Sequence, residues 1–215
     1  HVWERLKGFI IKAGTILFLA CVVMWFLGGF GFTNGGFGLV DDSADSLLAV
    51  IGGFIAPIFA PLGWGNWKMA VAAVTGLIAK ENVVGTFGIL FGFGEVAEDG
   101  AEIWGQLAGS LSTVAAYSFL VFNLLCAPCF AAMGAIKREM NNTKWFWFAI
   151  GYQTLLAYVV SLCVYQIGTL VTTGAFGVGT VVAFLFIIGF IYLLFRPYKE
   201  SETLEVHMKG MAGAK

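Results

Sequence analysis

Apolar residues in this chain form long continuous runs, and charged residues are largely confined to the stretches between them. No Asp, Glu, Lys or Arg occurs between Trp145 and Phe195. A helix needs about 20 apolar residues to cross a hydrocarbon core about 30 Å thick, because it rises about 1.5 Å per residue. This region therefore predicts two membrane-spanning helices joined by a short turn.

Six runs in all are long enough to cross a bilayer. They are Ala13 to Phe32, Leu47 to Trp67, Met69 to Phe93, Leu107 to Ile136, Trp145 to Ile167 and Gly174 to Phe195. The composition agrees, since the chain is 59% hydrophobic and only 12% charged, whereas soluble domains are about 25% charged. The pattern predicts an all-α polytopic membrane protein with about six transmembrane segments, and it excludes a disordered chain.

Two of the six runs are not simple helices. Leu47 to Trp67 contains Gly52, Gly53, Pro57, Pro61, Gly63 and Gly65, and a proline inside a helix removes a backbone hydrogen bond and clashes with the carbonyl four residues back. Leu107 to Ile136 is too long for one untilted crossing and is interrupted by Pro128. Irregular backbone at membrane depth persists only where protein buries it or a wet cavity receives it. Paired discontinuous or re-entrant helices of this kind indicate the binding site of a transporter.

The lysines and arginines sort to one side of these runs if each run crosses once. That side collects eleven of the twelve cations, namely Arg5, Lys7, Lys12, Lys68, Lys137, Arg138, Lys144, Arg196, Lys199, Lys209 and Lys215. The opposite side is acidic and holds Asp41, Asp42, Asp45, Glu95, Glu98, Asp99 and Glu102. Because cytoplasmic loops are enriched in Lys and Arg, both ends of the chain are predicted to be cytoplasmic. The acidic side is either a set of solvated loops or a surface that concentrates cations.

Lys80 and Glu81 fall about midway along Met69 to Phe93, where burying a charge costs about 2.5–3.5 kcal/mol. Adjacent residues on a helix point about 100° apart, so the two side chains cannot simply neutralise each other. Each therefore needs its own partner or water. The alternatives are a structural ion pair with another helix and a carboxylate that borders a cation path.

A second cluster of candidate residues surrounds Pro128. In a continuous helix Cys126, Cys129 and Met133 stand at i, i+3 and i+7 and would share one face. Pro128 also lacks the amide that would bond to the Leu124 carbonyl, so that oxygen is predicted to be exposed. Sulfur beside a free carbonyl suits a late first-row cation better than Na⁺, Mg²⁺ or Ca²⁺, which prefer oxygen ligands.

Other uses of the cysteines remain open. A C-x-x-C pair can carry out thiol redox chemistry, although no βαβ pattern surrounds this one. A structural zinc or iron–sulfur site would need about four ligands, and Cys21 and Cys163 stand alone in other runs, where cysteine usually acts as a small hydrophobe. No phosphate-binding G-x-x-x-x-G-K-[ST] motif occurs, and a net charge of −1 offers no nucleic-acid footprint.

Several motifs, in order from His1 to about Gln166, resemble the C-terminal membrane region of the bacterial ferrous iron transport protein B family. They are His1-x-Trp3-Glu4-Arg5, Phe9-Ile10-x-Lys12-Ala13-Gly14-Thr15-Ile16, Ile55-Ala56-Pro57 with Pro61-Leu62-Gly63, Gly76-x-x-Ala79-Lys80-Glu81-x-Val83-Val84-Gly85-Thr86, Pro128-Cys129 and Lys137-Arg138-Glu139. The resemblance implies a multi-pass Fe²⁺ importer of the bacterial inner membrane, built from two gate repeats. The gate cysteine of the family corresponds to Cys129, and its buried Lys-Glu pair corresponds to Lys80 and Glu81.

The same resemblance implies a division of the chain. Residues 1–12 would be a cytoplasmic lead-in, 13–144 the second gate repeat, 145–195 a transmembrane hairpin and 196–215 a cytoplasmic tail. A GTPase domain, with its GTP and Mg²⁺, and the first gate repeat would lie upstream of His1, which fits the absence of an initiator Met; the chain itself would be no enzyme. Small cytoplasmic Feo-type proteins and further copies of the chain are the other expected partners, besides the lipid bilayer.

The resulting hypothesis is half of an Fe²⁺ translocation path with no tightly held metal, because conduction requires weak binding at several sites. Cys129, Glu81, Cys126 and Met133 are the candidate transient ligands, and Lys80, Pro128 and Pro57 are candidates for gating or structural roles. Two alternatives remain: a nucleoside or other organic-solute carrier with a gate-type fold, and a membrane thiol oxidoreductase that uses Cys126 and Cys129.

Overall fold

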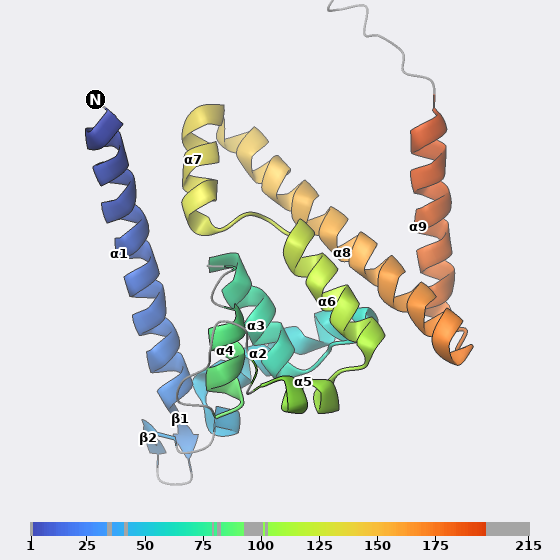
Figure 1. Ribbon diagram of the computed structural model, residues 1–215, viewed down its shortest axis with the longest axis horizontal. Helices are drawn as coiled ribbons and strands as arrows, with labels where there is room; N and C mark the ends of the chain where they lie inside the picture. Colours follow the sequence, from blue (N-terminus) through green and yellow to red (C-terminus); the bar gives the residue numbers. More distant parts are fainter. Residues whose placement is uncertain are drawn as a thin grey trace, which may run out of the picture.

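The computed structural model describes residues 2–33, 36–40, 43–78, 80, 83–92, 101 and 103–196. These residues are almost entirely helical (Figure 1), which confirms the predicted all-α fold class. In chain order the elements are α1 (Val2–Gly29), β1 (Phe30–Thr33), β2 (Gly36–Leu39), η1 (Ser43–Asp45), α2 (Leu47–Phe59), η2 (Ala60–Leu62), α3 (Trp67–Ile78), α4 (Val83–Leu90), α5 (Trp104–Ser110), α6 (Thr113–Leu125), α7 (Phe130–Met140), α8 (Thr143–Thr173) and α9 (Val178–Phe195).

The described residues contain two helices, α8 and α9, that are long and apolar enough to cross a membrane, or up to four spans if each of two bent pairs counts as one. The α2–η2 segment meets α3 at 94°, and α5 meets α6 at 106°. The prediction of broken or re-entrant elements is therefore confirmed. The bend between α5 and α6 was not predicted, and α1 ends at Gly29, so that Phe30 to Phe32 belong to a β-hairpin rather than to the first run.

The predicted break in Leu47 to Trp67 is present, but it does not lie at Pro57. α2 continues through Pro57 to Phe59, and the chain turns only after η2, at Gly63. Gly63 has a φ of 87°, in the left-handed region that glycine adopts without a steric penalty. The position of this break is thus set by Gly63, downstream of both prolines.

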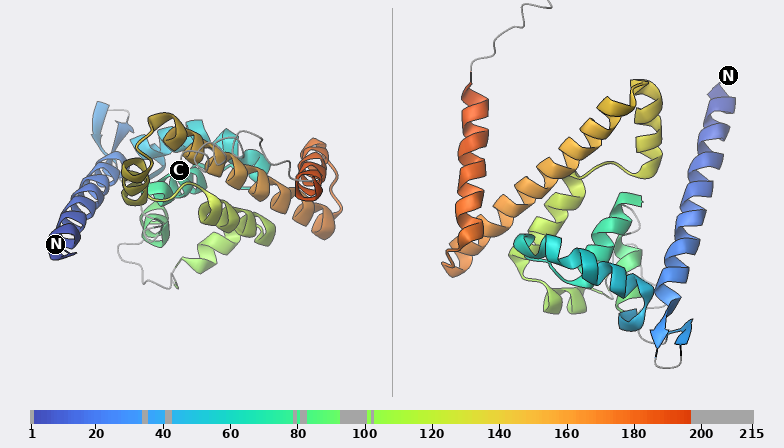
Figure 2. Two further views of the ribbon diagram at one scale, coloured as in Figure 1. Left: turned by 90° about the horizontal axis from the view of Figure 1, so that it is seen from above. Right: turned by 180° about the vertical axis from the view of Figure 1, so that it is seen from behind.

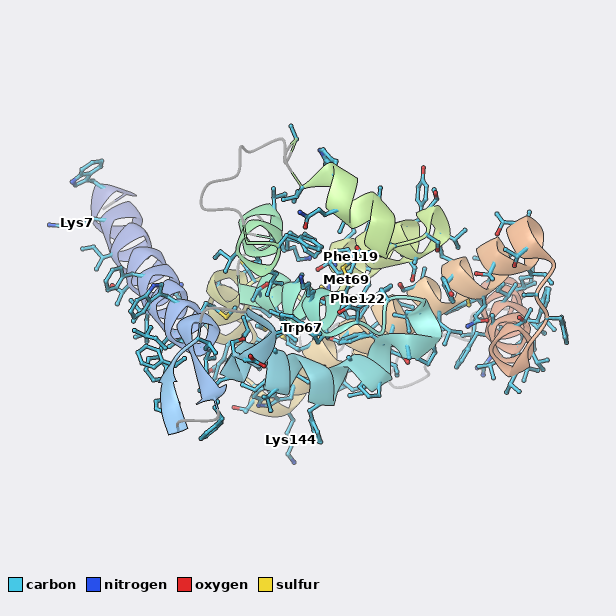
Figure 3. The ribbon with its side chains drawn as sticks, turned by 90° about the horizontal axis from the view of Figure 1, so that it is seen from below. Lys7, Trp67, Met69, Phe119, Phe122 and Lys144 are labelled. Atoms are coloured by element: carbon cyan, nitrogen blue, oxygen red, sulfur yellow. The ribbon has the colours of Figure 1, made fainter. Side chains whose placement is uncertain are left out.

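The largest core cluster lies where this turn meets α6 and α8. Trp64 is 2% exposed and stacks on Phe59 with ring centroids 4.4 Å apart, and its Nε1 donates to Ser118 Oγ of α6 at 3.3 Å. The hydroxyls of Ser118 and of Ser161 on α8 lie 2.8 Å apart, and each is placed to donate to the backbone oxygen of the other residue. Figure 3 shows Met69, Phe119 and Phe122 gathered at the centre, while Lys7 and Lys144 extend outward. Polar contacts between apolar helices fix their register in a bilayer.

Helix α8 also satisfies carbonyls that the first break leaves without helical partners. The Tyr158 hydroxyl donates to Ile58 O at 2.7 Å, and Gln166 Nε2 donates to Pro61 O at 2.8 Å. The last carbonyls of any helix lack internal partners, and a membrane supplies no water to replace them. Two neutral side chains therefore stabilise the end of α2–η2.

A close approach of α2 to α3 leads to a prediction on neighbouring glycines. A Cβ on Gly52 would lie 2.6 Å from Val71 Cγ2 and 2.8 Å from the backbone oxygen of Trp67, whereas a Cβ on Gly53 meets no described atom within 4 Å. We expect Gly52→Ala to lower the free energy of unfolding by about 1–3 kcal/mol through overpacking. Gly53→Ala, the matched control, should raise it by up to about 1 kcal/mol because alanine favours a helix. Thermal unfolding of the detergent-purified protein measures both, and equal shifts would contradict the close approach.

The basic segments lie at one end of the molecule. Figures 1 and 2 place the start of α1, the α7–α8 junction with Lys137, Arg138 and Lys144, and the end of α9 at that end, opposite the β1–β2 hairpin. Lys68 was assigned to the same side on the assumption that the runs before and after it cross the membrane separately. In the structure α2–η2 and α3 form one bent pair, so that assumption does not hold. The Lys68 ammonium lies 4.6 Å from the ring centroid of Phe91, just after α4. The side of the membrane that each end faces stays a prediction.

Candidate site at the break between α6 and α7

The second break lies between α6 and α7, at the predicted proline. α6 ends at Leu125, and the next residues leave the helix: Cys126 has φ −62° and ψ 169°, and Cys129, the N-cap of α7, has φ −57° and ψ 158°. Pro128 has no amide hydrogen and disfavours helical geometry in the residue before it, so the chain is extended across this link. The prediction of one helix face carrying Cys126, Cys129 and Met133 is therefore wrong, because no helix runs through all three.

The two cysteines of the link occupy different environments. Cys126 is completely buried; its amide donates to Phe122 O at 2.8 Å, and its thiol donates to Asn123 O at 3.3 Å. Cys129 is partly exposed and begins α7, where its carbonyl accepts the Met133 amide at 2.9 Å. Cys126 thus belongs to the end of α6, whereas Cys129 and Met133 belong to the first turn of α7.

The remaining candidates are distributed as follows. Cys21 lies in α1, and Cys163 is a buried free thiol of α8 whose Sγ donates to Ala183 O at 3.7 Å. Among the residues that the structure describes, no group of three or more His, Cys, Asp or Glu side chains could hold a metal ion. Glu81 lies outside the described residues. The structure therefore gives Cys163 a contact between α8 and α9 and leaves the role of Glu81 as a prediction.

Lys80 reaches this break from the segment between α3 and α4. Its Nζ donates to Leu124 O and to Cys126 O, each at 3.4 Å. The Leu124 carbonyl is the one that the amide of residue 128 would bond in a continuous helix, so the prediction that Pro128 leaves it available is confirmed. The sequence did not indicate that Lys80 would donate a hydrogen bond to this carbonyl.

Asn123 is a site residue that the sequence reasoning missed. Its Nδ2 donates to Phe119 O at 2.9 Å, while its Oδ1 is buried and has no hydrogen-bond partner among the described residues. A Cβ on Gly76 would lie 2.8 Å from that oxygen, so Asn123 faces α3 one turn before Lys80. The available signal was a carboxamide within an apolar run, since polar residues inside a membrane usually line a functional path.

Comparison with known proteins assigns this chain to a family. The family profile named Gate, described as nucleoside recognition, matches residues 10–143. The chain belongs to the Gate family. The Gate match includes both helix breaks and ends where α8 begins, so α8 contacts the first break from outside the matched region. No solved structure shows a significant match to the chain.

The curated relatives of this Gate chain confirm the resemblance drawn from its motifs. It is 39% identical over 175 residues to the Fe(2+) transporter FeoB of Methanocaldococcus jannaschii, a match that covers 79% of this chain and 25% of the relative. It is 33% identical over 168 residues to Fe(2+) transporter FeoB of Staphylococcus aureus strain N315, covering 78% and 24%. For Fe(2+) transporter FeoB of Legionella pneumophila strain Lens the identity is 31% over 210 residues, covering 75% and 27%. The chain thus spans about a quarter of the length of these relatives.

Proposed function

We propose that this chain forms part of a transmembrane path for Fe²⁺, as the C-terminal half of the translocation path of a GTP-regulated importer in the bacterial inner membrane. The observation that supports it most directly is the contact of Lys80, from the segment between α3 and α4, with the freed carbonyls of the break between α6 and α7, beside the cysteine-bearing link. Discontinuous helices whose freed carbonyls line a path are a recurrent way to handle a cation in a membrane. The relatives named as Fe(2+) transporters supply the identity of the cation.

The residues at the second break have distinct proposed roles. Cys129, partly exposed at the start of α7, is the first candidate for a transient Fe²⁺ ligand, with Met133 one turn further along. Cys126 is a second sulfur that the ion would reach only after a local rearrangement, because its side chain is completely buried. Glu81 is proposed from the sequence to attract or hand on the cation. Weak binding at several such sites permits conduction.

The rest of the assembly is proposed by analogy with the relatives, since the chain spans only about a quarter of their length. A GTPase domain with GTP and Mg²⁺ and a first gate repeat would belong to the same protein. Small cytoplasmic Feo-type proteins and further copies of the chain would be additional partners, and both ends of this chain would face the cytoplasm. Pro128 fixes the second break, whereas Pro57 has a structural place inside α2.

Fe²⁺ uptake in cells that lack their own ferrous importer tests this function. We expect the complete gene to restore uptake of radiolabelled Fe²⁺ under reducing conditions, and Cys129→Ser to lower the initial rate. Loss of a residue that hydrogen-bonds to a metal ligand lowers metal affinity or activity by about 10–100-fold. The loss of a ligand itself should therefore lower the uptake rate by at least about 10-fold. Cys163→Ser is the matched control, because Cys163 is a free thiol that contacts α9 rather than the link.

The outcomes separate the alternatives. Unimpaired uptake by Cys129→Ser at matched expression would leave iron transport standing and remove the sulfur ligand. No uptake by well-expressed intact protein would contradict the function, and nucleoside competition assays would then test the organic-solute carrier. A reversible disulfide between Cys126 and Cys129, detected by thiol titration, would instead support the thiol oxidoreductase.

A further inference from the structure

Side chains from other elements satisfy the freed carbonyls at both breaks, but with different chemistry. At the first break the donors to Ile58 O and Pro61 O are a neutral hydroxyl and a neutral amide. At the second break the donor to Leu124 O and Cys126 O is the ammonium of Lys80. On insertion scales a lysine at the centre of a membrane span costs about 2.5–3.5 kcal/mol. A neutral donor would suffice to pair a carbonyl, so the charge at the second break requires a further explanation.

The end of α6 is electrostatically suited to a cation. Aligned peptide dipoles place about half a negative charge at the C-terminus of a helix, and α6 ends at Leu125 with two of its nearby carbonyls directed at one ammonium. Both N···O distances are 3.4 Å, longer than the 2.7–3.2 Å that is usual for N–H···O bonds. Lys80 is also only partly buried. The ammonium therefore lies between two oxygens without being tightly held by either.

A third oxygen lies on the same side of α6. The Nδ2 group of Asn123 must face Phe119 O, because only the nitrogen end of the carboxamide can donate to that carbonyl. This contact fixes Oδ1 toward Gly76, four residues before Lys80, where it is buried without a partner among the described residues. An unpaired buried acceptor costs about 1–3 kcal/mol. A cation that binds Asn123 Oδ1 transiently would offset this cost.

We propose that Leu124 O, Cys126 O and Asn123 Oδ1 form a cation site, that the Lys80 ammonium holds the two carbonyls in this conformation, and that the transported cation displaces this ammonium and also binds Asn123 Oδ1. The identity of that cation rests on the proposed function. The lysine is then a tethered competitor that keeps the site filled between transport events. A divalent ion gains about twice the Coulomb energy of a monovalent ion at the same carbonyls, and this gain opposes the larger cost of dehydrating the divalent ion.

Removal of the ammonium tests the displacement. The apparent dissociation constant for the cation equals the intrinsic constant divided by the fraction of protein whose site is free of the ammonium. If the ammonium fills the site about nine-tenths of the time, it raises the apparent constant about 10-fold. We therefore expect Lys80→Met to lower the half-saturation concentration for Fe²⁺ uptake by about 10-fold. Gln166→Met is the matched control, because it removes a neutral donor to Pro61 O and should leave half-saturation unchanged.

A half-saturation concentration that is unchanged or higher in Lys80→Met would overturn the displacement, since a purely structural lysine predicts less folded protein without tighter binding. Intact protein that shows no Fe²⁺ uptake would instead contradict the proposed function. The two failures are therefore distinguishable.

A labelling experiment on the unmodified protein covers the case in which Lys80→Met does not fold. Full-length protein in detergent is treated with a small amine-reactive reagent under anaerobic, reducing conditions, with and without Fe²⁺, and the modification of each lysine is measured by mass spectrometry. Displacement predicts that Fe²⁺ increases the labelling of Lys80 several-fold, while Na⁺ does not. Lys137, exposed on α7, is the internal reference. Equal labelling of Lys80 with and without Fe²⁺ would overturn the proposal.

The third oxygen has its own test. Asn123→Leu keeps a similar volume but removes Oδ1, so we expect the half-saturation concentration for Fe²⁺ to rise about 10-fold, as for the loss of other partners at metal sites. An unchanged value would overturn the three-oxygen site.

Discussion

Gly63→Ala is expected to lower the free energy of unfolding by about 3 kcal/mol or more, the sum of a left-handed backbone penalty and overpacking. The backbone of Gly63 has a φ of 87°, which an alanine adopts only at a cost of about 1–2 kcal/mol. A Cβ at this position would also overlap the ring of Tyr165 on α8. The turn after η2 therefore depends on the absence of a side chain at Gly63.

Gly174→Ala separates the two contributions. Gly174, the C-cap of α8, also has a positive φ, 68°, but no described atom lies within 4 Å of a Cβ built there. Its replacement should cost only the backbone penalty of about 1–2 kcal/mol. Thermal unfolding of the detergent-purified full-length protein measures both variants. Equal shifts in unfolding temperature would show that Tyr165 does not pack against the turn.

Local backbone chemistry is the part of this fold that could be predicted from the sequence. Pro128 lacks an amide wherever it stands, so both the break between α6 and α7 and the free carbonyl of Leu124 follow from one residue. Pro57 shows the limit of the same rule, because α2 accommodates it and continues. The position of a proline determines which backbone hydrogen bond is lost, but the packing around it determines whether the helix ends there.

Contacts between distant segments could not be predicted in the same way. Lys80 and the carbonyls of Leu124 and Cys126 are more than forty residues apart, and no local pattern indicates that they meet. The expected cysteine face failed for a related reason, since the i, i+3, i+7 rule assumes the continuous helix that Pro128 interrupts. Asn123 carried a local signal, a carboxamide in an apolar run, but the free oxygen depends on how α6 packs against α3.

The contact between α3 and α6 also depends on a glycine, Gly76. We expect Gly76→Val to reduce Fe²⁺ uptake to less than about a tenth, comparable to the loss of a metal-site partner. A Cβ on Gly76 would lie 2.8 Å from Asn123 Oδ1 and 3.1 Å from Val83 Cγ2. Interiors this closely packed do not absorb added methyl groups without movement. The added methyl groups would therefore displace the Asn123 carboxamide and remove its Oδ1 from the proposed cation site.

Gly134→Val is the control for this effect, because Gly134 is exposed on α7 and a Cβ there meets no described atom within 4 Å. Both variants place a valine where a helix has glycine, so their intrinsic helix propensities change alike. Initial rates of radiolabelled Fe²⁺ uptake at matched expression should then fall only in Gly76→Val. If Gly76→Val transports as the unmodified protein does, the close approach of α3 to Asn123 is not needed for transport, and a cation site that includes Asn123 Oδ1 is contradicted. If uptake falls while the protein still purifies as a folded species, the loss is assigned to the contact between α3 and Asn123 rather than to the stability of either helix.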